Sequence, residues 1–257
     1  MLKSLDLTGR VAVVIGGTSG IGRTLALGLA EAGADVVATG RRENLVKEVA
    51  AEIEKSGGKS LAVAVDVLNR ASVDQLRDAV MKHFGRADIL LNAAGKIGRK
   101  PTKDFPEVEW DETFNVNVTG ALRACQAFYE PLKASGHGRI INIVSLNSFV
   151  SLREVAAYAA SKSALLALTR SLAVEWSAEG INVNAIAPGV FRTDLNKNLL
   201  DSTDRGKELL MRTPMKRFGQ TGELNGAAVL LASDAASFIT GQCIVVDGGF
   251  LASGVNS

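Results

Sequence analysis

The stretch Gly16-Gly-Thr-Ser-Gly20-Ile-Gly22 stands between an apolar run predicted as a strand, residues 10–16, and a segment predicted as a helix, residues 20–32. Glycines at such a junction permit a tight turn and let a pyrophosphate approach the backbone amides at the helix N-terminus. A flexible turn is the alternative, but the strand before and the helix after favour phosphate binding. The predicted dinucleotide contacts are Gly16, Thr18, Ser19, Gly20, Ile21 and Gly22.

The rest of the chain alternates apolar runs with amphipathic segments of helical length. Predicted strands cover residues 10–16, 35–39, 61–65, 88–91, 139–144, 182–187 and 243–246, and predicted helices cover 20–32, 43–56, 71–84, 107–132, 155–179 and 224–232. Strands that are apolar throughout are buried on both faces, and strands separated by helices form a parallel sheet. We therefore predict one doubly wound α/β domain over residues 1–257, a Rossmann fold with a mostly parallel, seven-stranded sheet.

The composition limits the partners. Of 257 residues, 47% are hydrophobic and 22% are charged, and the net charge of +2 is too small to indicate a nucleic-acid or membrane partner. Two cysteines, Cys125 and Cys243, exclude a disulfide framework and favour a reducing cytoplasmic location. Cysteine and histidine show no metal-ligand spacing, so no metal is predicted, and His83 and His137 are expected at the surface.

The end of the second predicted strand indicates which dinucleotide binds. A fold that prefers NAD usually has an acid about twenty residues after the glycines, which bonds the ribose 2′-hydroxyl. Here the sequence reads Thr39-Gly40-Arg41-Arg42, without an acid and with two guanidiniums. Because guanidinium suits phosphate by charge and forked geometry, Arg41 and Arg42 predict NADP. NAD is the alternative if the arginines are only solvated at a helix start.

Other strand ends should lie along the same edge, where open α/β sheets bind ligands. The loops over residues 96–106 and 190–219 follow strands and are longer than a packing connection needs, which is typical of lids and binding loops. Asp66 and Val67 are expected to meet the adenine. Further cofactor contacts are predicted at Asn92, Ala93, Gly95, Pro188, Gly189 and Thr193.

Tyr158-Ala-Ala-Ser-Lys162 predicts an acid/base pair. Tyrosine and lysine four residues apart share one face of a helix, and the ammonium favours the phenolate, which lowers a tyrosine pKa of about 10. Ser145 follows a predicted buried strand, so its hydroxyl would hold a substrate oxygen while Tyr158 moves the proton. Alone, the pattern also fits an ordinary amphipathic helix.

Together these motifs resemble those of the classical short-chain dehydrogenase/reductase family over essentially the whole chain. They are Gly16-x-x-x-Gly20-Ile-Gly22, Asn92-Ala-Ala-Gly95, Asn117 in Asn-Val-Asn-Val-Thr-Gly, Ser145, Tyr158-x-x-x-Lys162 and Asn184-Ala-Ile-Ala-Pro188-Gly189. The resemblance implies that Tyr158 is the acid/base and that Ser145 orients the substrate oxygen. Lys162 would hold the nicotinamide ribose and lower the Tyr158 pKa. Asn117 would position a water beyond Lys162, with Asn115 as its rival.

Two positions depart from the family pattern. Ile15 stands where the family usually has Thr, and Ala93 stands where it usually has a second Asn. In the family that Thr makes a polar contact between the first and fourth strands. We expect Ile15 and Ala93 to form an apolar substitute that leaves the site competent.

The resemblance implies an oxidoreductase that transfers hydride between nicotinamide C4 and a secondary alcohol or ketone, in a cytoplasmic homotetramer. Thr213-Pro-Met-Lys-Arg-Phe-Gly219 and the tail after Asp247 look most like the sugar-acid branch, the gluconate 5-dehydrogenase-like enzymes. A 3-oxoacyl-[acyl-carrier-protein] reductase is the alternative, and a non-catalytic dinucleotide-binding sensor or scaffold is a remote one. Residues 190–219 are expected to bind the small-molecule substrate. Polar side chains expected near the cleft mouth are Lys96, Arg99, Asn147, Arg153 and Arg192.

Overall fold

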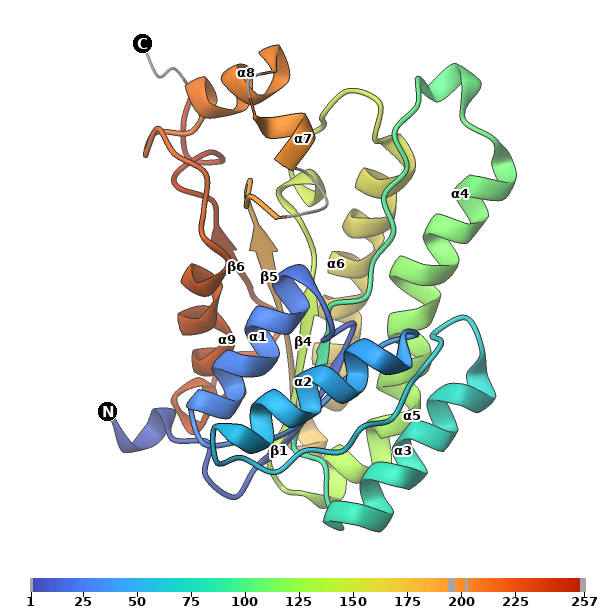
Figure 1. Cartoon of the computed structure of the whole chain (residues 1–257), viewed down its shortest axis with the longest axis vertical. Helices are drawn as coiled ribbons and strands as arrows, with labels where there is room; N and C mark the ends of the chain where they lie inside the picture. The colour runs from blue at the N-terminus through green and yellow to red at the C-terminus, as the bar shows by residue number, and fades with distance from the viewer. Residues whose placement is uncertain (1, 194–196, 202, 255–257) are drawn as a thin grey trace.

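The computed structural model describes residues 2–193, 197–201 and 203–254 (Figure 1). They form one six-stranded sheet with the order β2-β1-β3-β4-β5-β6, and every neighbouring pair is parallel. The strands are β1 Val11–Ile15, β2 Asp35–Thr39, β3 Ile89–Asn92, β4 Gly138–Ile143, β5 Ile181–Pro188 and β6 Cys243–Val246. The strand order reverses after β1, which is the mark of the predicted doubly wound fold.

Helices cover both faces of the sheet (Figure 1). They are α1 Gly20–Glu31, α2 Glu43–Lys55, α3 Arg70–Phe84, α4 Glu107–Phe114, α5 Gly120–Ala134, α6 Ala156–Trp176, α7 Lys197–Leu200, α8 Asp204–Arg212 and α9 Asn225–Ala232. Alternate strand residues belong to two separate cores. Val14 packs with α1, α2 and α9, whereas Val13 packs with α3, α5 and α6. Burial of both faces explains why the strands are apolar throughout.

The strand predicted over residues 61–65 does not form. Ser60 makes an isolated bridge to Val36, and Val65 N donates to Gly40 O at 3.0 Å, while the Thr39 hydroxyl donates to Val63 O. This stretch lies at the edge of the sheet beside β2 and contacts it on one side only. Because a side-chain hydroxyl replaces a ladder bond there, the sheet has six strands and not seven.

The long helix predicted over residues 107–132 is interrupted. α4 ends at Phe114, a π-helical turn covers Asn115–Thr119, and α5 starts at Gly120. Gly120 packs directly on Val67, since a Cβ on this glycine would lie 2.9 Å from Val67 Cβ. Single π-helical turns within helices are frequent at functional sites. The apolar pattern runs on through the turn, so the sequence does not reveal it.

His137 is buried, which contradicts its predicted surface position. It is 4% exposed, with Nδ1 2.9 Å from Asp234 Oδ1 and Nε2 3.0 Å from Ala232 O. Burial lowers the pKa of His137, and the contact with Ala232 opposes that shift. The loop around His137 lies under the end of α9, a long-range contact that its local sequence does not indicate. His83 is exposed as predicted.

The described residues contain neither a membrane-spanning helix nor a cluster of metal-binding side chains. Every helix is too short or too polar to span a bilayer. In the same residues, no three His, Cys, Asp or Glu side chains gather closely enough to hold a metal ion.

Candidate active site

The glycine-rich turn lies between β1 and α1, as predicted. Gly16 N and Gly17 N donate to Thr39 O at 2.8 and 2.9 Å, which ties the turn to the end of β2. A Cβ on Gly22 would lie 2.1 Å from Gly16 O, so only glycine lets the first turn of α1 approach the loop this closely. No side chain caps α1 at Ser19. The free amides at this N-terminus therefore fit a phosphate.

Arg41 and Arg42 lie beside this turn and are exposed. Arg42 Nη2 donates to Ser19 Oγ at 3.1 Å, which places its guanidinium at the phosphate loop. Arg41 makes no hydrogen bond or ion pair with the described part of the chain. The arrangement therefore offers two guanidiniums, and no acid, where the ribose next to the adenine is expected.

Asp66 and Val67 follow the irregular stretch beside β2. The Asp66 backbone N–H donates to Ser72 Oγ at 3.0 Å, and its carboxylate accepts from Leu68 N at 3.0 Å. Val67 is 8% exposed, and its side chain belongs to the core that contains α3 and α5. These contacts fix both residues at the carboxyl edge of the sheet.

Ile15 and Ala93 do not form the expected apolar pair. Ile15 belongs to the core of α3 and α5, whereas Ala93 packs in the core of α1 and lies 3.1 Å from a Cβ placed on Gly22. The two side chains are on opposite faces because their backbones are offset by one residue in register, with Ile15 opposite Asn92. A backbone hydrogen bond of 2.8 Å, from Ala93 N to Ile15 O, joins the strands instead. Asn92 Nδ2 donates to Asn142 Oδ1 at 2.9 Å in the next strand.

Ser145, Tyr158 and Lys162 come together beyond the end of β4. Ser145 lies two residues past the strand, is 7% exposed, and accepts from Asn147 N at 3.2 Å. Lys162 Nζ donates to Ile143 O at 2.6 Å and lies 5.8 Å from the centroid of the Tyr158 ring. The predicted spacing therefore does bring ammonium, phenol and hydroxyl close together at this edge of the sheet.

The pKa shifts of this pair differ from the prediction. Burial raises the pKa of Tyr158, and the interaction with the Ser145 side chain lowers it only in part. Burial lowers the pKa of Lys162 to about 8. The net shift at Tyr158 is opposite in direction to the one predicted from Tyr-x-x-x-Lys. Desolvation dominates because both groups lie within the protein and the ammonium is bonded to a backbone carbonyl.

Asn117, and not Asn115, lies next to Lys162. A Cβ placed on Gly95 would be 3.6 Å from Asn117 Oδ1 and 3.7 Å from Lys162 Nζ, so this glycine lies between them. The Asn117 carboxamide accepts from Lys96 N at 2.7 Å and donates to Lys96 O at 2.9 Å. Asn115 instead accepts from Arg123 at 2.8 Å. The geometry favours Asn117 for the place in the relay that the family implies.

Pro188 and Gly189 lie at the carboxyl end of β5, on the same edge of the sheet. Pro188 is the last residue of β5 and pairs with Val246, and Gly189 N donates to Val246 O at 2.8 Å. Thr193, a predicted cofactor contact, is half-buried four residues further on. Of the predicted substrate segment, residues 194–196 and 202 lie outside the described residues, and the rest includes α7 and α8.

The predicted cations at the cleft mouth differ in their partners. Lys96 pairs with Glu112, and Arg192 pairs with Asp201 at 2.6 Å. Arg99 makes no hydrogen bond or ion pair with the described residues. Asn147 is buried, and its Oδ1 has no partner among the described side chains and backbone.

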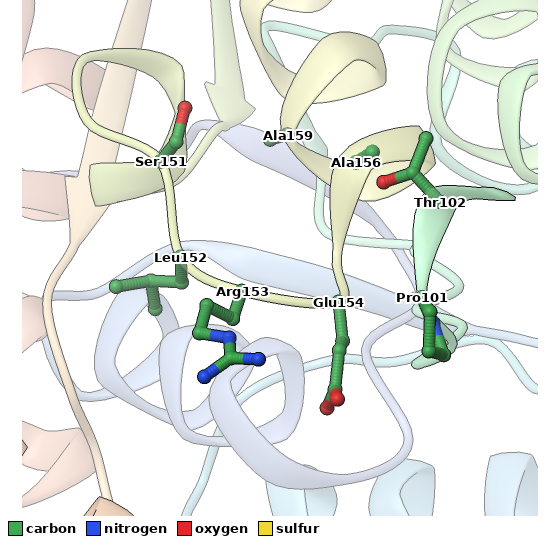
Figure 2. Close-up of a pocket in the computed structure, with 8 residues that line it drawn as sticks. All are labelled: Pro101, Thr102, Ser151, Leu152, Arg153, Glu154, Ala156 and Ala159. Carbon is green, nitrogen blue, oxygen red and sulfur yellow. The ribbon is translucent and has the colours of Figure 1, made fainter.

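Arg153 and Glu154 lie beside a hollow of about 400 Å³ (Figure 2), lined by Pro101, Thr102, Ser151, Leu152, Arg153, Glu154, Ala156 and Ala159. Arg205 of α8, which was not among the predicted site residues, approaches this loop. Its Nη2 donates to Arg153 O at 3.1 Å, and its Nη1 lies 3.8 Å from a Glu154 carboxylate oxygen. Arg205 gives no motif signal, because its role depends on how α8 docks.

The fold and the cleft define a dinucleotide-binding oxidoreductase, and comparisons with known proteins agree. The family model described as enoyl-(acyl carrier protein) reductase matches residues 15–251. The chain belongs to the short-chain dehydrogenase/reductase family, and it is an NAD(P)-dependent oxidoreductase that acts on CH–OH groups.

Similar proteins match over nearly the whole chain. The 2-dehydro-3-deoxy-D-gluconate 5-dehydrogenase of Dickeya dadantii (strain 3937) is 40% identical over 98% of this chain and 99% of its own. The NAD-dependent glycerol dehydrogenase of Listeria innocua is 38% identical over 96% of both chains. A solved gluconate 5-dehydrogenase from Burkholderia cenocepacia J2315, in complex with NADP and tartrate, has a TM-score of 0.95 and 39% identity, covering 98% of this chain and 99% of its own.

Proposed function

We propose that this chain is an NADP(H)-dependent oxidoreductase that interconverts a secondary alcohol and a ketone on a sugar acid or polyol. The observation that carries the proposal is the meeting of Ser145, Tyr158 and Lys162 beyond the end of β4, at the same edge of the sheet as the uncapped first turn of α1. Relatives with this architecture are named for 2-dehydro-3-deoxy-D-gluconate, gluconate and glycerol, which are all polyhydroxylated.

The residues of the cleft have distinct roles in this proposal. A bound nicotinamide supplies or accepts the hydride at C4. Tyr158 protonates the substrate oxygen during reduction, and its raised pKa keeps it a neutral phenol, ready to donate, at pH 7. Ser145 donates a hydrogen bond to the same oxygen as negative charge develops there. Lys162 binds the nicotinamide ribose, and the turn that contains Asn117 continues the proton relay.

The edge of the sheet fits NADP as its dinucleotide. The α1 N-terminus offers free amides to the pyrophosphate, and Gly16 and Gly22 leave room for its approach. Arg41 and Arg42 would bind a 2′-phosphate, because both guanidiniums are exposed and Arg42 already contacts the loop through Ser19. NAD binding is the alternative, since one similar protein is named as NAD-dependent.

Residues 190–219 form the proposed substrate-binding segment of a single domain that spans residues 1–257. α8 of this segment contacts the loop before α6 through Arg205. Burial lowers the pKa of Arg99, and the nearby positive charge of Arg205 lowers it further. Arg99 makes no ion pair in the described chain. Two neighbouring guanidiniums suit the carboxylate of a sugar acid.

A panel of carbonyl substrates tests the proposal. Initial rates are measured with NADPH and 5-ketogluconate, dihydroxyacetone or an acetoacetyl thioester, and NADH is compared with the best substrate. We expect the highest kcat/KM with a hydroxylated ketone and NADPH. Preference for the thioester would indicate the 3-oxoacyl-[acyl-carrier-protein] reductase alternative. NADPH binding without turnover on any carbonyl would indicate the sensor or scaffold.

The proposed assembly is a homotetramer in the cytoplasm that acts on small molecules and not on nucleic acid or membranes. Val174 of α6 is 82% exposed, which supports a further apolar contact between copies along this helix. Both cysteines, Cys125 and Cys243, are free thiols, as suits a reducing compartment. Light scattering of the purified protein measures the assembly, and a monomeric mass at working concentration would contradict it.

A further inference from the structure

Arg123 of α5 joins two parts of the molecule that are distant in sequence. Its Nη1 donates to the Val67 carbonyl at 3.0 Å and to Asn115 Oδ1 at 2.8 Å. The side chain is half-buried and has no carboxylate partner in the described chain. A guanidinium that loses water without gaining an ion pair is costly, so its neutral acceptors must be well placed.

The first acceptor belongs to the proposed adenine wall, residues 66–67. Neighbouring backbone donors there are used, since Asp66 N donates to Ser72 Oγ and Leu68 N donates to Asp66 Oδ1, both at 3.0 Å. The Val67 N–H has no acceptor among the described residues. By bonding the carbonyl of Val67, Arg123 fixes the backbone conformation of this residue, whose N–H remains available to a ligand at the adenine wall. Gly120 packs closely against the Val67 side chain, because a Cβ at this glycine would lie only 2.9 Å from Val67 Cβ.

The second acceptor belongs to the π-helical turn Asn115–Thr119. Asn115 opens that turn, two residues before Asn117, whose carboxamide makes both bonds to the Lys96 backbone. Asn117 also donates to Ser161 Oγ at 2.9 Å, and Ser161 donates to Tyr158 O at 2.8 Å. The turn that Arg123 holds is therefore linked by direct hydrogen bonds to the helix that presents Tyr158 and Lys162.

We propose that Arg123 is a positioning residue that couples the adenine wall to the turn of the proton relay. Occupation of the wall by the adenosine half of the cofactor restricts the motion of Val67. The hydrogen bonds of Arg123 then restrict the motion of Asn115 and of the π-helical turn. The inference rests on the proposed function for the chemistry at Tyr158. The coupling itself does not depend on catalysis and is measurable without turnover.

Hydrogen exchange tests the coupling with the adenine half alone. Amide exchange of the peptide that covers residues 115–119 is measured with and without adenosine 2′,5′-bisphosphate, in the natural protein, Arg123→Met, Arg123→Lys and Arg70→Met. Arg70 is the control because it donates to Gln126 of α5 at 2.9 Å but touches neither Val67 nor Asn115. We expect the ligand to slow exchange in the natural protein and in Arg70→Met, but not in Arg123→Met at saturating ligand.

Kinetics give a second readout. Arg123→Met should weaken NADPH binding, followed by nicotinamide fluorescence, by about tenfold, the effect of losing a hydrogen bond from a charged donor. It should also lower kcat at saturating NADPH and shift the pH profile of kcat. Arg123→Lys, which keeps the positive charge on a shorter side chain, should restore part of both effects.

Three results would overturn the proposal. The first is that the ligand slows amide exchange in Arg123→Met as much as it does in Arg70→Met. The second is that the NADPH affinity of Arg123→Met is within twofold of that of Arg70→Met. The third is that neither kcat nor its pH profile changes in Arg123→Met. If Arg123→Met does not fold, the same comparisons are made with Arg123→Lys. Absence of turnover in the natural protein would contradict the proposed function and leave the exchange comparison decisive for Arg123.

Discussion

Lys162 Nζ lies 2.6 Å from the backbone carbonyl oxygen of Ile143, so α6 is bonded at its catalytic face to the last residue of β4. Lys162 is only 3% exposed, and this carbonyl is the one hydrogen-bond acceptor its ammonium has among the described residues. A buried ammonium with a neutral partner is poorly solvated, which is why its pKa falls to about 8. The strand end and the helix therefore hold a lysine that is ready to exchange a proton near neutral pH.

The first prediction concerns the pH dependence of stability. The folded-state pKa of Lys162, about 8, is below its ordinary value of 10.5, so the unfolded chain binds more protons between these pH values. The unfolding free energy contributed by Lys162 therefore rises with pH from 8 to 10.5, by about 3 kcal/mol at most. Chemical denaturation of the natural protein and Lys162→Met at pH 7 and pH 10 measures the difference. Equal slopes with pH in both proteins would contradict the buried, deprotonating lysine.

The second prediction concerns Tyr158→Phe. Loss of the phenol oxygen removes the proton donor, while the ring still fills its place beside Ser145. We expect turnover to fall by orders of magnitude, and NADPH affinity to stay within about threefold of the natural protein. Steady-state rates and cofactor fluorescence measure the two effects. More than a tenth of the natural turnover would mean that another group moves the proton.

The third prediction concerns the choice of dinucleotide. Gly40→Asp with Arg41→Ala places a carboxylate at the ribose 2′-position and removes one phosphate ligand. The preference should move from NADPH toward NADH, because a carboxylate bonds the 2′-hydroxyl and repels a 2′-phosphate. A Cβ on Gly40 would lie 3.0 Å from Thr18 Oγ1, so Gly40→Ala is the matched steric control. The assignment of NADP fails if the natural enzyme already has a higher kcat/KM with NADH.

The fourth prediction concerns the docking of α8. Arg205→Ala removes the hydrogen bond to Arg153 O and the 3.8 Å approach to Glu154, so α8 should close less firmly over the cleft. We expect KM for the carbonyl substrate to rise by about fivefold to tenfold, the effect of one hydrogen bond from a charged donor, with unchanged NADPH affinity. Lys207→Ala is the control, because Lys207 is on the same helix and its ion pair within the described residues is with exposed Asp204. An equal rise in KM in both variants would argue against a specific Arg205 contact.

The fold could be predicted wherever burial on both faces leaves a continuous apolar run. The last strand was predicted at residues 243–246 and forms over Cys243–Val246. Residues 61–65 were also apolar, yet they contact β2 from one side only and do not complete a ladder. Hydropathy reports burial, and it does not report whether a partner strand is present to accept the hydrogen bonds.

The residues of the site also fall into those that local sequence predicts and those that it does not. The glycine-rich turn, the paired arginines and the order Ser145, Tyr158, Lys162 could be predicted from the sequence, because each depends on residue type and short spacing. The π-helical turn at Asn117, the burial of His137 and the contact between Arg123 and Val67, which are 56 residues apart in the chain, depend on tertiary packing. It also reversed the expected pKa shift of Tyr158. Desolvation and hydrogen-bond partners are set by neighbours that come together only on folding, and local sequence does not encode them.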